Sequence, residues 1–376
     1  MGNTGLLKLA LRCALLAALV GLAPPGMAAS DQDIPDFELT VQQGDTLTGL
    51  GKRWLAEPKR WPELQRHNKI QNPNRLVPGS KIAIPVSLLR GELAEVTVSS
   101  VSGQARRGDG APVATGDRLR EGATVRTAED GYVTIQLVDG STLRLQSRSD
   151  LTVSRARRLP GSGATETRFQ MQTGRAEVQF KPAVPKASRF EIRTGFASAA
   201  VRGTEFRVAA DDHGTRTEVN EGTIAFAGLP PNAHAGAPDE SVPVPEGFGS
   251  IVDESCKAMA PVRLLAAPVL PQEPVFQRAP TLRLAFPPME GAVGYRARLA
   301  ADADFQRMIG EAVLSEPQAS FSGLETGSYV LGVRAIDKFG LEGRDAMTLI
   351  GILPDAPPAS AAPVSTPPAS APAKDR

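Results

Sequence analysis

The chain has 376 residues, with 42 Lys and Arg residues against 41 Asp and Glu residues and a formal net charge of +1. Nucleic-acid-binding domains usually have a strong basic excess, so this balance argues against nucleic acid as a partner. The length predicts two or three domains. The 36 glycines and 32 prolines, with only 5% aromatic residues, favour short strands joined by many turns.

The first segment, residues 1–29, has the pattern of a secretory signal peptide. Lys8 and Arg12 precede an apolar run at residues 13–22 that is too short to span a bilayer, and cleavage is expected near Ala29. An uncleaved N-terminal anchor is the alternative. No later stretch approaches the roughly 18 apolar residues of a spanning helix. We therefore expect a periplasmic protein without a membrane span after signal cleavage.

Chemistry-bearing residues are sparse. Cleavage leaves Cys256 as the single cysteine, so no intramolecular disulfide is expected, and we favour a passive thiol over a nucleophile or an intermolecular bridge. His67, His213 and His234 lack the close spacing of zinc ligands, so neither a metal nor another cofactor is expected. No nucleophile elbow or phosphate loop is present. Paired carboxylates need only be close in space, so a wall hydrolase is the remaining catalytic alternative to a non-enzyme.

The segment at residues 36–87 predicts a strand, two helices and a second strand. Apolar and polar residues alternate over residues 37–41, as in a half-buried strand. Residues 47–54 place apolar side chains at helical spacing, and Pro62 suits the first turn of a second helix. Residues 81–84 alternate again and form the second strand.

These residues resemble the LysM family over essentially one whole domain. The matching motifs are Gly44-Asp45-Thr46-Leu47, Trp61-Pro62-Glu63-Leu64, and Pro78-Gly79 ahead of the second strand. The resemblance implies a small α+β domain that binds peptidoglycan through glycan containing N-acetylglucosamine. Gly49 and Gly51 depart from good helix composition, each costing about 1 kcal/mol against Ala.

The resemblance also implies a shallow glycan groove between two loops. Its candidate residues are Gly44, Asp45, Thr46 and Leu47 on one side, and Ile70, Gln71, Asn72 and Arg75 on the other. Backbone groups would bond the N-acetyl group, while Leu47 and Ile70 would contact its methyl. Asp45 and Thr46 are also placed to cap the first helix, a role compatible with binding.

Residues 92–250 predict an all-β domain, a sandwich or a solenoid-like roll. Residues 132–137 and 143–145 alternate on either side of Asp139-Gly140, which predicts a hairpin. Further alternating runs occur at residues 176–180, 190–192, 206–208 and 223–226.

Within this segment, residues from about 96 to 226 resemble the periplasmic FecR domain, with Val201-Arg202-Gly203-Thr204-Glu205-Phe206 as the most specific motif. That family relays signals between an outer-membrane receptor and a cytoplasmic sigma factor, which requires a cytoplasmic segment and a membrane span. Neither is found in the sequence, so only the fold and a general protein-contact role are implied. Arg202 and Glu205 are candidate partner contacts. The alternative, which we favour, is charges facing water beside a turn.

The rest of the chain predicts a linker at residues 251–272, a small fibronectin type III-like β-sandwich at residues 273–353, and a disordered Pro/Ala/Ser tail at residues 354–376. The predicted fold class is multidomain and mainly β. We expect a non-catalytic, peptidoglycan-binding protein whose β-domains contact unidentified envelope proteins. The alternative is a sensory or regulatory protein of FecR type, with the LysM domain as a tether.

Overall fold

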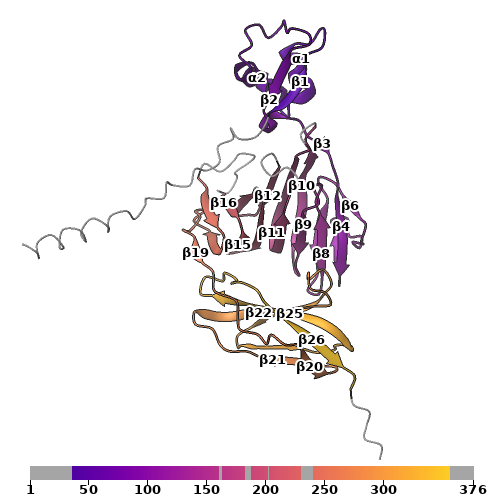
Figure 1. Ribbon diagram of the computed structural model, residues 1–376, viewed down its shortest axis with the longest axis vertical. Coiled ribbons are helices and arrows are strands. Elements are labelled where there is room, and N and C mark those ends of the chain that lie inside the picture. The colour runs from indigo at the N-terminus through magenta and orange to yellow at the C-terminus, as the bar shows by residue number, and fades with distance from the viewer. Residues whose placement is uncertain (1–35, 161–162, 183–187, 202, 230–239, 356–376) are drawn as a thin grey trace, which may run out of the picture.

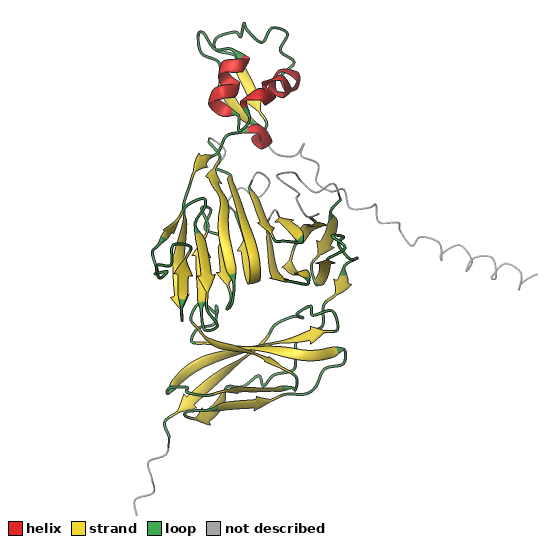
Figure 2. Cartoon of the chain, turned by 180° about the vertical axis from the view of Figure 1, so that it is seen from behind, coloured by secondary structure: helices red, strands yellow, loops and turns green. Residues whose placement is uncertain are grey.

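The computed structural model describes residues 36–160, 163–182, 188–201, 203–229 and 240–355. They form three domains in a row, with the helices gathered in the domain at one end (Figures 1 and 2). The predicted fold class, multidomain and mainly β, is confirmed. No helix in these residues is long and apolar enough to cross a membrane. The expected signal peptide and the tail beyond residue 355 lie outside the described residues.

The N-terminal domain, residues 36–90, packs two short helices against a two-stranded ladder. Thr46 begins the first helix, because its Oγ1 accepts a hydrogen bond from the Gly49 N–H at 3.1 Å. The two strands are antiparallel, with Phe37 opposite Ile84. The predicted order of strand, helix, helix and strand is confirmed. The elements are β1 (Phe37–Thr40), α1 (Leu47–Trp54), η2 (Pro58–Arg60), α2 (Trp61–His67), β2 (Lys81–Ile84) and η3 (Val86–Leu88).

The N-terminal domain shares its hydrophobic core with the next domain. Leu159 and Ala164, which lie between strands β10 (Asp150–Arg158) and β11 (Thr165–Phe180), are buried in the same cluster as Leu88. The two domains are therefore joined by packed side chains as well as by the chain itself.

The middle domain, residues 91–263, is a sandwich of two sheets that share the 16-residue strand β11. Its first half pairs with β10 and β12 in one sheet, and its second half pairs with β9 and β14 in the other. The further strands are β3 (Glu92–Leu93), β4 (Val96–Ser102), β5 (Ala105–Arg107), β6 (Arg118–Leu119), β7 (Thr124–Thr127), β8 (Tyr132–Gln136), β9 (Thr142–Leu145), β12 (Arg189–Arg193), β13 (Ala197–Val201), β14 (Thr204–Asp211), β15 (Gly214–Glu221), β16 (Thr223–Gly228), β17 (Val242–Pro245), β18 (Phe248–Asp253) and β19 (Val262–Arg263).

The predicted hairpin and alternating runs are present in this sandwich. Strands β8 and β9 pair with Ile135 opposite Leu143. The inward-facing positions fill the space between the sheets, where the ring of Phe190 lies 5.3 Å from that of Phe180 and 5.8 Å from that of Phe169. The sandwich is therefore held by an aromatic and aliphatic core.

The C-terminal domain, residues 270–355, is a smaller sandwich. Its five-stranded sheet has the order β20-β26-β25-β22-β23 and faces the two-stranded sheet β21-β24. Strand β20 joins parallel to β26, and the other pairs are antiparallel. The strands are β20 (Val275–Arg278), β21 (Leu282–Ala285), β22 (Ala292–Ala300), β23 (Met308–Leu314), β24 (Gln318–Phe321), β25 (Gly327–Asp337) and β26 (Ala346–Leu353).

The stretch predicted as a linker at residues 251–272 is largely built into the two flanking domains. Strand β18 runs past residue 250, and β19 pairs back onto it. Leu270 is buried in the core of the C-terminal domain. The expected boundary therefore falls inside a strand, because turn-rich composition does not distinguish a linker from short paired strands.

The C-terminal domain packs its five-stranded sheet against the outer face of the middle domain (Figure 1). One flank of this interface is apolar, where Tyr132 of β8 is buried with Phe305, Met308 and Val330. On another flank a Cβ on Gly249 would lie 2.9 Å from the Leu341 side chain, so this side chain packs directly on the Gly249 backbone. Charged residues occupy the area between these flanks.

Candidate functional site

The two candidate glycan-binding loops lie at the same end of the β1–β2 ladder. One loop follows β1 and the other precedes β2, and the Val41 N–H donates to the Ser80 carbonyl there at 2.8 Å. The chain leaves for the middle domain from the opposite end of the ladder, after Ile84. The loops are therefore at the free end of the molecule (Figure 1).

The first loop is held by its own side chains. Asp45 accepts a hydrogen bond from the Gln42 N–H at 2.8 Å and another from Arg53 at 2.7 Å. The backbone hydrogen bond from Gln42, followed by the interactions with Arg53, lowers the pKa of Asp45. Gly44 has a φ of 86°, a left-handed conformation that favours glycine. Thr46 thus has the capping role expected beside its proposed binding role, whereas Asp45 braces the turn and does not cap the helix.

The second loop is fastened to the first by one backbone hydrogen bond. The Leu47 N–H donates to the Pro73 carbonyl at 2.9 Å. Asn72 Oδ1 accepts from the Asn74 N–H at 3.0 Å and so shapes the turn. Gln71, Asn72 and Arg75 are exposed. The structure thus brings the two predicted halves together.

Leu47 and Ile70 differ in exposure. The Leu47 side chain is fully buried, whereas Ile70 is partly exposed and packs on the edge of the same core. The Leu47 N–H is also already bonded to Pro73. Of the two apolar side chains predicted to line the groove, Ile70 is therefore the one that reaches the surface.

The candidate partner contact in the middle domain is described only in part. Glu205 is half-buried and accepts hydrogen bonds from the Gln179 and Asn220 side-chain amides, each at 3.3 Å. Arg202 lies outside the described residues. Glu205 is therefore bonded within its own sheet, and its role as a partner contact stays a prediction.

The described residues contain no cluster of three or more His, Cys, Asp or Glu residues suited to a metal ion. Cys256 is a free, partly buried thiol whose Sγ lies 3.7 Å from the Glu254 carbonyl oxygen. His67 pairs with Asp36 at 2.5 Å on the surface of the N-terminal domain.

An ionic layer, which the sequence did not predict, lies between the middle and C-terminal domains. Glu177 is its centre, accepting from Arg298 at 2.8 Å and pairing with Arg334 at 2.7 Å. The layer consists of Arg144, Arg175, Glu177, Arg207 and Glu218 from the middle domain, with Arg296, Arg298, Glu311, Arg334, Glu342 and Asp345 from the C-terminal domain.

The carboxylates of the ionic layer differ in how their pKa values shift. Burial alone would raise the pKa of Glu177, but Arg298, Arg334 and Arg144 outweigh it and hold that pKa well below its usual value. Arginines likewise outweigh burial at Glu342 and Asp345 and lower both pKa values. At Glu218, burial dominates and, with the nearby Glu342 carboxylate, raises the pKa.

Backbone groups also tie the two domains together. Arg207 on β14 donates to the carbonyl oxygens of Glu342 and Gly343 at 2.6 and 2.9 Å. The Glu342 N–H in turn donates to Glu218 at 3.1 Å. The net stability that such a buried ionic interface adds is small, because removing the charges from water offsets much of their attraction.

The fold and the candidate site describe a multidomain, mainly β protein with a LysM-type domain at one end. The LysM domain profile matches residues 39–85, and the profile of the FecR protein family matches residues 123–225. Each match covers less than half of the chain. LysM and FecR-like domains are binding or regulatory modules without catalytic groups of their own, and both are typical of envelope proteins.

The similarity to an individual curated protein is confined to a short segment. An uncharacterized protein of Deinococcus radiodurans is 31% identical over 55 residues, which is 15% of this chain and 22% of that protein. The chain thus matches about a fifth of the length of this curated relative.

Two solved structures align with low scores. A candidate anti-sigma factor from Parabacteroides distasonis is 15% identical, with a TM-score of 0.30 over 41% of this chain and 77% of that chain. The extracellular domain of a candidate one-component system from B. thetaiotaomicron is 10% identical, with a TM-score of 0.18 over 61% of this chain and 35% of that chain.

Proposed function

We propose that this chain is a non-catalytic periplasmic protein that binds peptidoglycan through the two loops of its LysM domain. Its middle and C-terminal domains present surfaces to other envelope proteins. The observation that supports the proposal most is the pair of loops at the free end of the molecule, joined by the Leu47–Pro73 hydrogen bond. Their exposed polar side chains and Ile70 match the polar and methyl groups of an N-acetylated sugar.

Co-sedimentation of the purified full-length protein with peptidoglycan sacculi tests this proposal. We expect the protein to pellet with sacculi and to be released by soluble N-acetylglucosamine oligomers. The triple variant Gln71→Ala, Asn72→Ala and Arg75→Ala should pellet at least tenfold less. The matched control exchanges exposed residues outside the loops, Glu57→Ala with Lys59→Ala, and should pellet normally.

Intrinsic fluorescence tests whether the variants remain folded. The chain has two tryptophans, Trp54 and Trp61, and both lie in the N-terminal domain. Their emission therefore reports that domain alone within the full chain. A folded triple variant that pellets like the control, or pelleting unaffected by the oligomers, contradicts glycan binding through these loops.

A sensory or regulatory role of FecR type is the second candidate, favoured by the FecR profile match over residues 123–225. In that case the LysM domain only tethers the protein near its partner. The triple variant separates the two functions, because it should no longer bind peptidoglycan but should still bind a partner through the β-domains. Release of soluble muropeptides from sacculi would instead indicate a hydrolase.

A further inference from the structure

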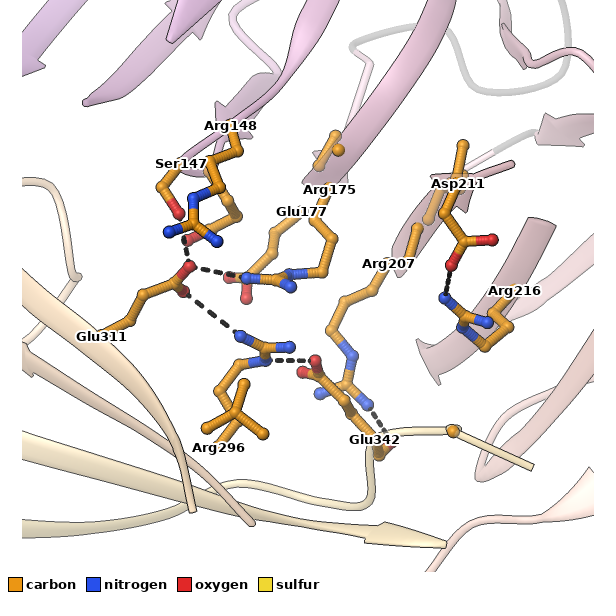
Figure 3. A pocket seen from close by; sticks show the side chains of 18 of the residues that line it. Ser147, Arg148, Arg175, Glu177, Arg207, Asp211, Arg216, Arg296, Glu311 and Glu342 are labelled. Carbon is orange, nitrogen blue, oxygen red and sulfur yellow. Dashed lines mark hydrogen bonds and ion pairs between the residues drawn. The ribbon is translucent and has the colours of Figure 1, made fainter. Parts of the chain in front are cut away.

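A pocket of about 680 Å³ opens between the middle and C-terminal domains, beside the ionic layer (Figure 3). Small-molecule sites commonly have volumes of about 300–1,000 Å³ and often lie at domain interfaces. One wall is the outer face of β11, β14 and β15, and the other comes mainly from β22, β23 and β25. Arg175, Glu311 and Arg296 extend into the space between these walls in Figure 3.

Four buried polar atoms on this lining have no hydrogen-bond partner among the described residues. Two are acceptors, Gln146 Oε1 and Glu311 Oε2, and two are donors, Arg207 Nη1 and Arg298 Nε. Gln146 is 5% exposed, and the side chain of Arg207 is also 5% exposed. Buried polar groups are nearly always hydrogen-bonded, so four such atoms on one pocket point to a ligand or to bound solvent.

Long ion-pair contacts do not satisfy two of these atoms. Glu311 Oε2 lies 3.7 Å from Arg296, and Arg207 Nη1 lies 3.6 Å from Asp345. Both separations exceed hydrogen-bond length. By contrast, Glu311 Oε1 is fully used, accepting from Ser147 and from Arg175, each at 2.6 Å. The second oxygen of the same carboxylate is therefore left able to accept one more donor.

The charge around the pocket is nearly balanced, which limits the class of ligand. Each rim arginine is paired: Arg148 with Glu129, and Arg216 with Asp211. A simple anion or cation would therefore meet little net attraction. The unpartnered atoms would instead be satisfied by a molecule that donates hydrogen bonds to Gln146 and Glu311 and accepts hydrogen bonds from Arg207 or Arg298.

We propose that this pocket binds a small zwitterion, a free amino acid or a short peptide with both termini uncapped. Its ammonium group would donate to Gln146 Oε1 and Glu311 Oε2. Its carboxylate would accept from the arginine side of the pocket, where charge-assisted bonds are strongest. This site lies between the middle and C-terminal domains and the candidate glycan loops lie at the far end of the N-terminal domain, so it neither requires nor excludes wall binding.

Thermal unfolding of the full-length protein with pools of free dipeptides tests the proposal. A ligand that binds only the folded state raises the unfolding midpoint, and at saturation we expect a rise of about 2–4 °C. The same pools, N-acetylated or C-amidated, should give no rise, because each capping reaction removes one of the two charges. A titration of the best uncapped pool then gives its apparent affinity.

Matched variants locate the binding. Gln146→Met keeps the volume and removes the acceptor, and should weaken the uncapped dipeptides about tenfold. Gln136→Met makes the same exchange at an exposed position of β8 and should leave their affinity unchanged. Glu311→Gln should weaken them further, since it removes the charge facing the ammonium group.

Three results would overturn the proposal. They are no shift with any uncapped pool, equal shifts with capped and uncapped pools, and unchanged affinity in a folded Gln146→Met variant. Equal shifts would mean that the pocket does not recognise the charged termini of the peptide. No shift at all would identify the pocket as a solvent-filled seam. Sedimentation with sacculi is unaffected by any of these results, so the glycan proposal is judged separately.

Discussion

Gly51 shows how a residue that weakens one element can be required by its packing. Within α1, glycine costs about 1 kcal/mol against alanine, which predicts a less stable helix. The structure shows why it is nevertheless suited to this place: a Cβ at Gly51 would lie 3.0 Å from both the Pro58 carbonyl oxygen and the Trp61 Cβ. Glycine thus permits α1 to approach the start of α2 closely.

We therefore expect Gly51→Ala to destabilise the N-terminal domain, although alanine is the better helix former. Crowding a packed core costs about 1–3 kcal/mol, which exceeds the gain in helix propensity. Gly49→Ala is the comparison, because it gains the same propensity and meets only the Thr46 side chain at 3.1 Å. Denaturation followed by the fluorescence of Trp54 and Trp61 measures both variants. A Gly51→Ala variant as stable as Gly49→Ala would contradict the packing argument.

At the level of single residues, some structural features of the candidate glycan loops are visible in local sequence pattern. Thr46 caps a helix through a bond to a residue three positions away, and such spacing is visible in sequence. The exposure of Leu47 and Ile70 was not visible, because both are apolar and both fit a groove. Only the packing of the two loops shows that Leu47 is in the core.

At the level of elements, strand β11 shows what alternation predicts and what it leaves open. Val178 and Phe180 were predicted to share one face, and both are buried in the sandwich core. Glu177 lies on the other face, which alternation alone would assign to water. It is nevertheless buried, because β22 and β25 of the C-terminal domain cover that face. Tertiary packing decides which face of a strand is covered by another domain, and local sequence pattern does not show it. The ionic layer was therefore not predicted.

Glu177→Gln tests the importance of the ionic layer. The amide has nearly the same shape but leaves Arg298 and Arg334 without their shared carboxylate. Breaking a buried ion pair in this way costs about 3–5 kcal/mol. We expect urea unfolding of the β-domains, followed by circular dichroism, to shift to lower denaturant concentration.

Glu95→Gln is the control for this substitution. Glu95 also pairs with two arginines, Arg118 at 3.6 Å and Arg120 at 2.5 Å, but both are highly exposed. Surface pairs contribute about 0–1 kcal/mol, so this variant should unfold almost like the parent protein. Equal effects of the two substitutions would show that burial of the layer has no energetic consequence.

At the level of the whole molecule, the ionic layer makes the stability of the packed middle and C-terminal domains dependent on pH. Glu177, Glu342 and Asp345 have lowered pKa values, so their stabilising contribution is present above the pKa of the unfolded chain, about 4, and is lost as the pH falls below it. Glu218 has a raised pKa, so its contribution has the opposite sign and declines as the pH rises. The three lowered groups outnumber the single raised one.

We therefore expect the thermal midpoint of the β-domains to fall between about pH 5 and pH 3. The fall should persist in 0.5 M salt, because salt screens exposed pairs much more than buried ones. Glu342→Gln should start from a lower midpoint at neutral pH and show a shallower fall. A midpoint that does not change over this pH range would contradict the lowered pKa values in the layer.

The order of the LysM and FecR-like segments agrees with the two family profiles, and strands are present at the alternating runs named from the sequence, because alternation is a local signal. Many other strands were not predicted, among them the nine-residue β10, the eight-residue β26 and the four-residue β20, which pairs with a strand more than 70 residues later. The predicted linker was also absorbed into neighbouring folds. These differences share one cause, which is that pairing between distant segments has no local pattern.

The shared core at Leu159 and Ala164 has a mechanical consequence. A domain on a loose tether would rotate freely and absorb a pull by straightening its linker. Here a force applied to the C-terminal domain while the glycan loops are held passes through packed side chains at one junction and paired charges at the other. If the loops bind glycan as proposed, the molecule would behave as a rigid spacer. It would fix both the distance of the C-terminal domain from the glycan and the orientation of that domain.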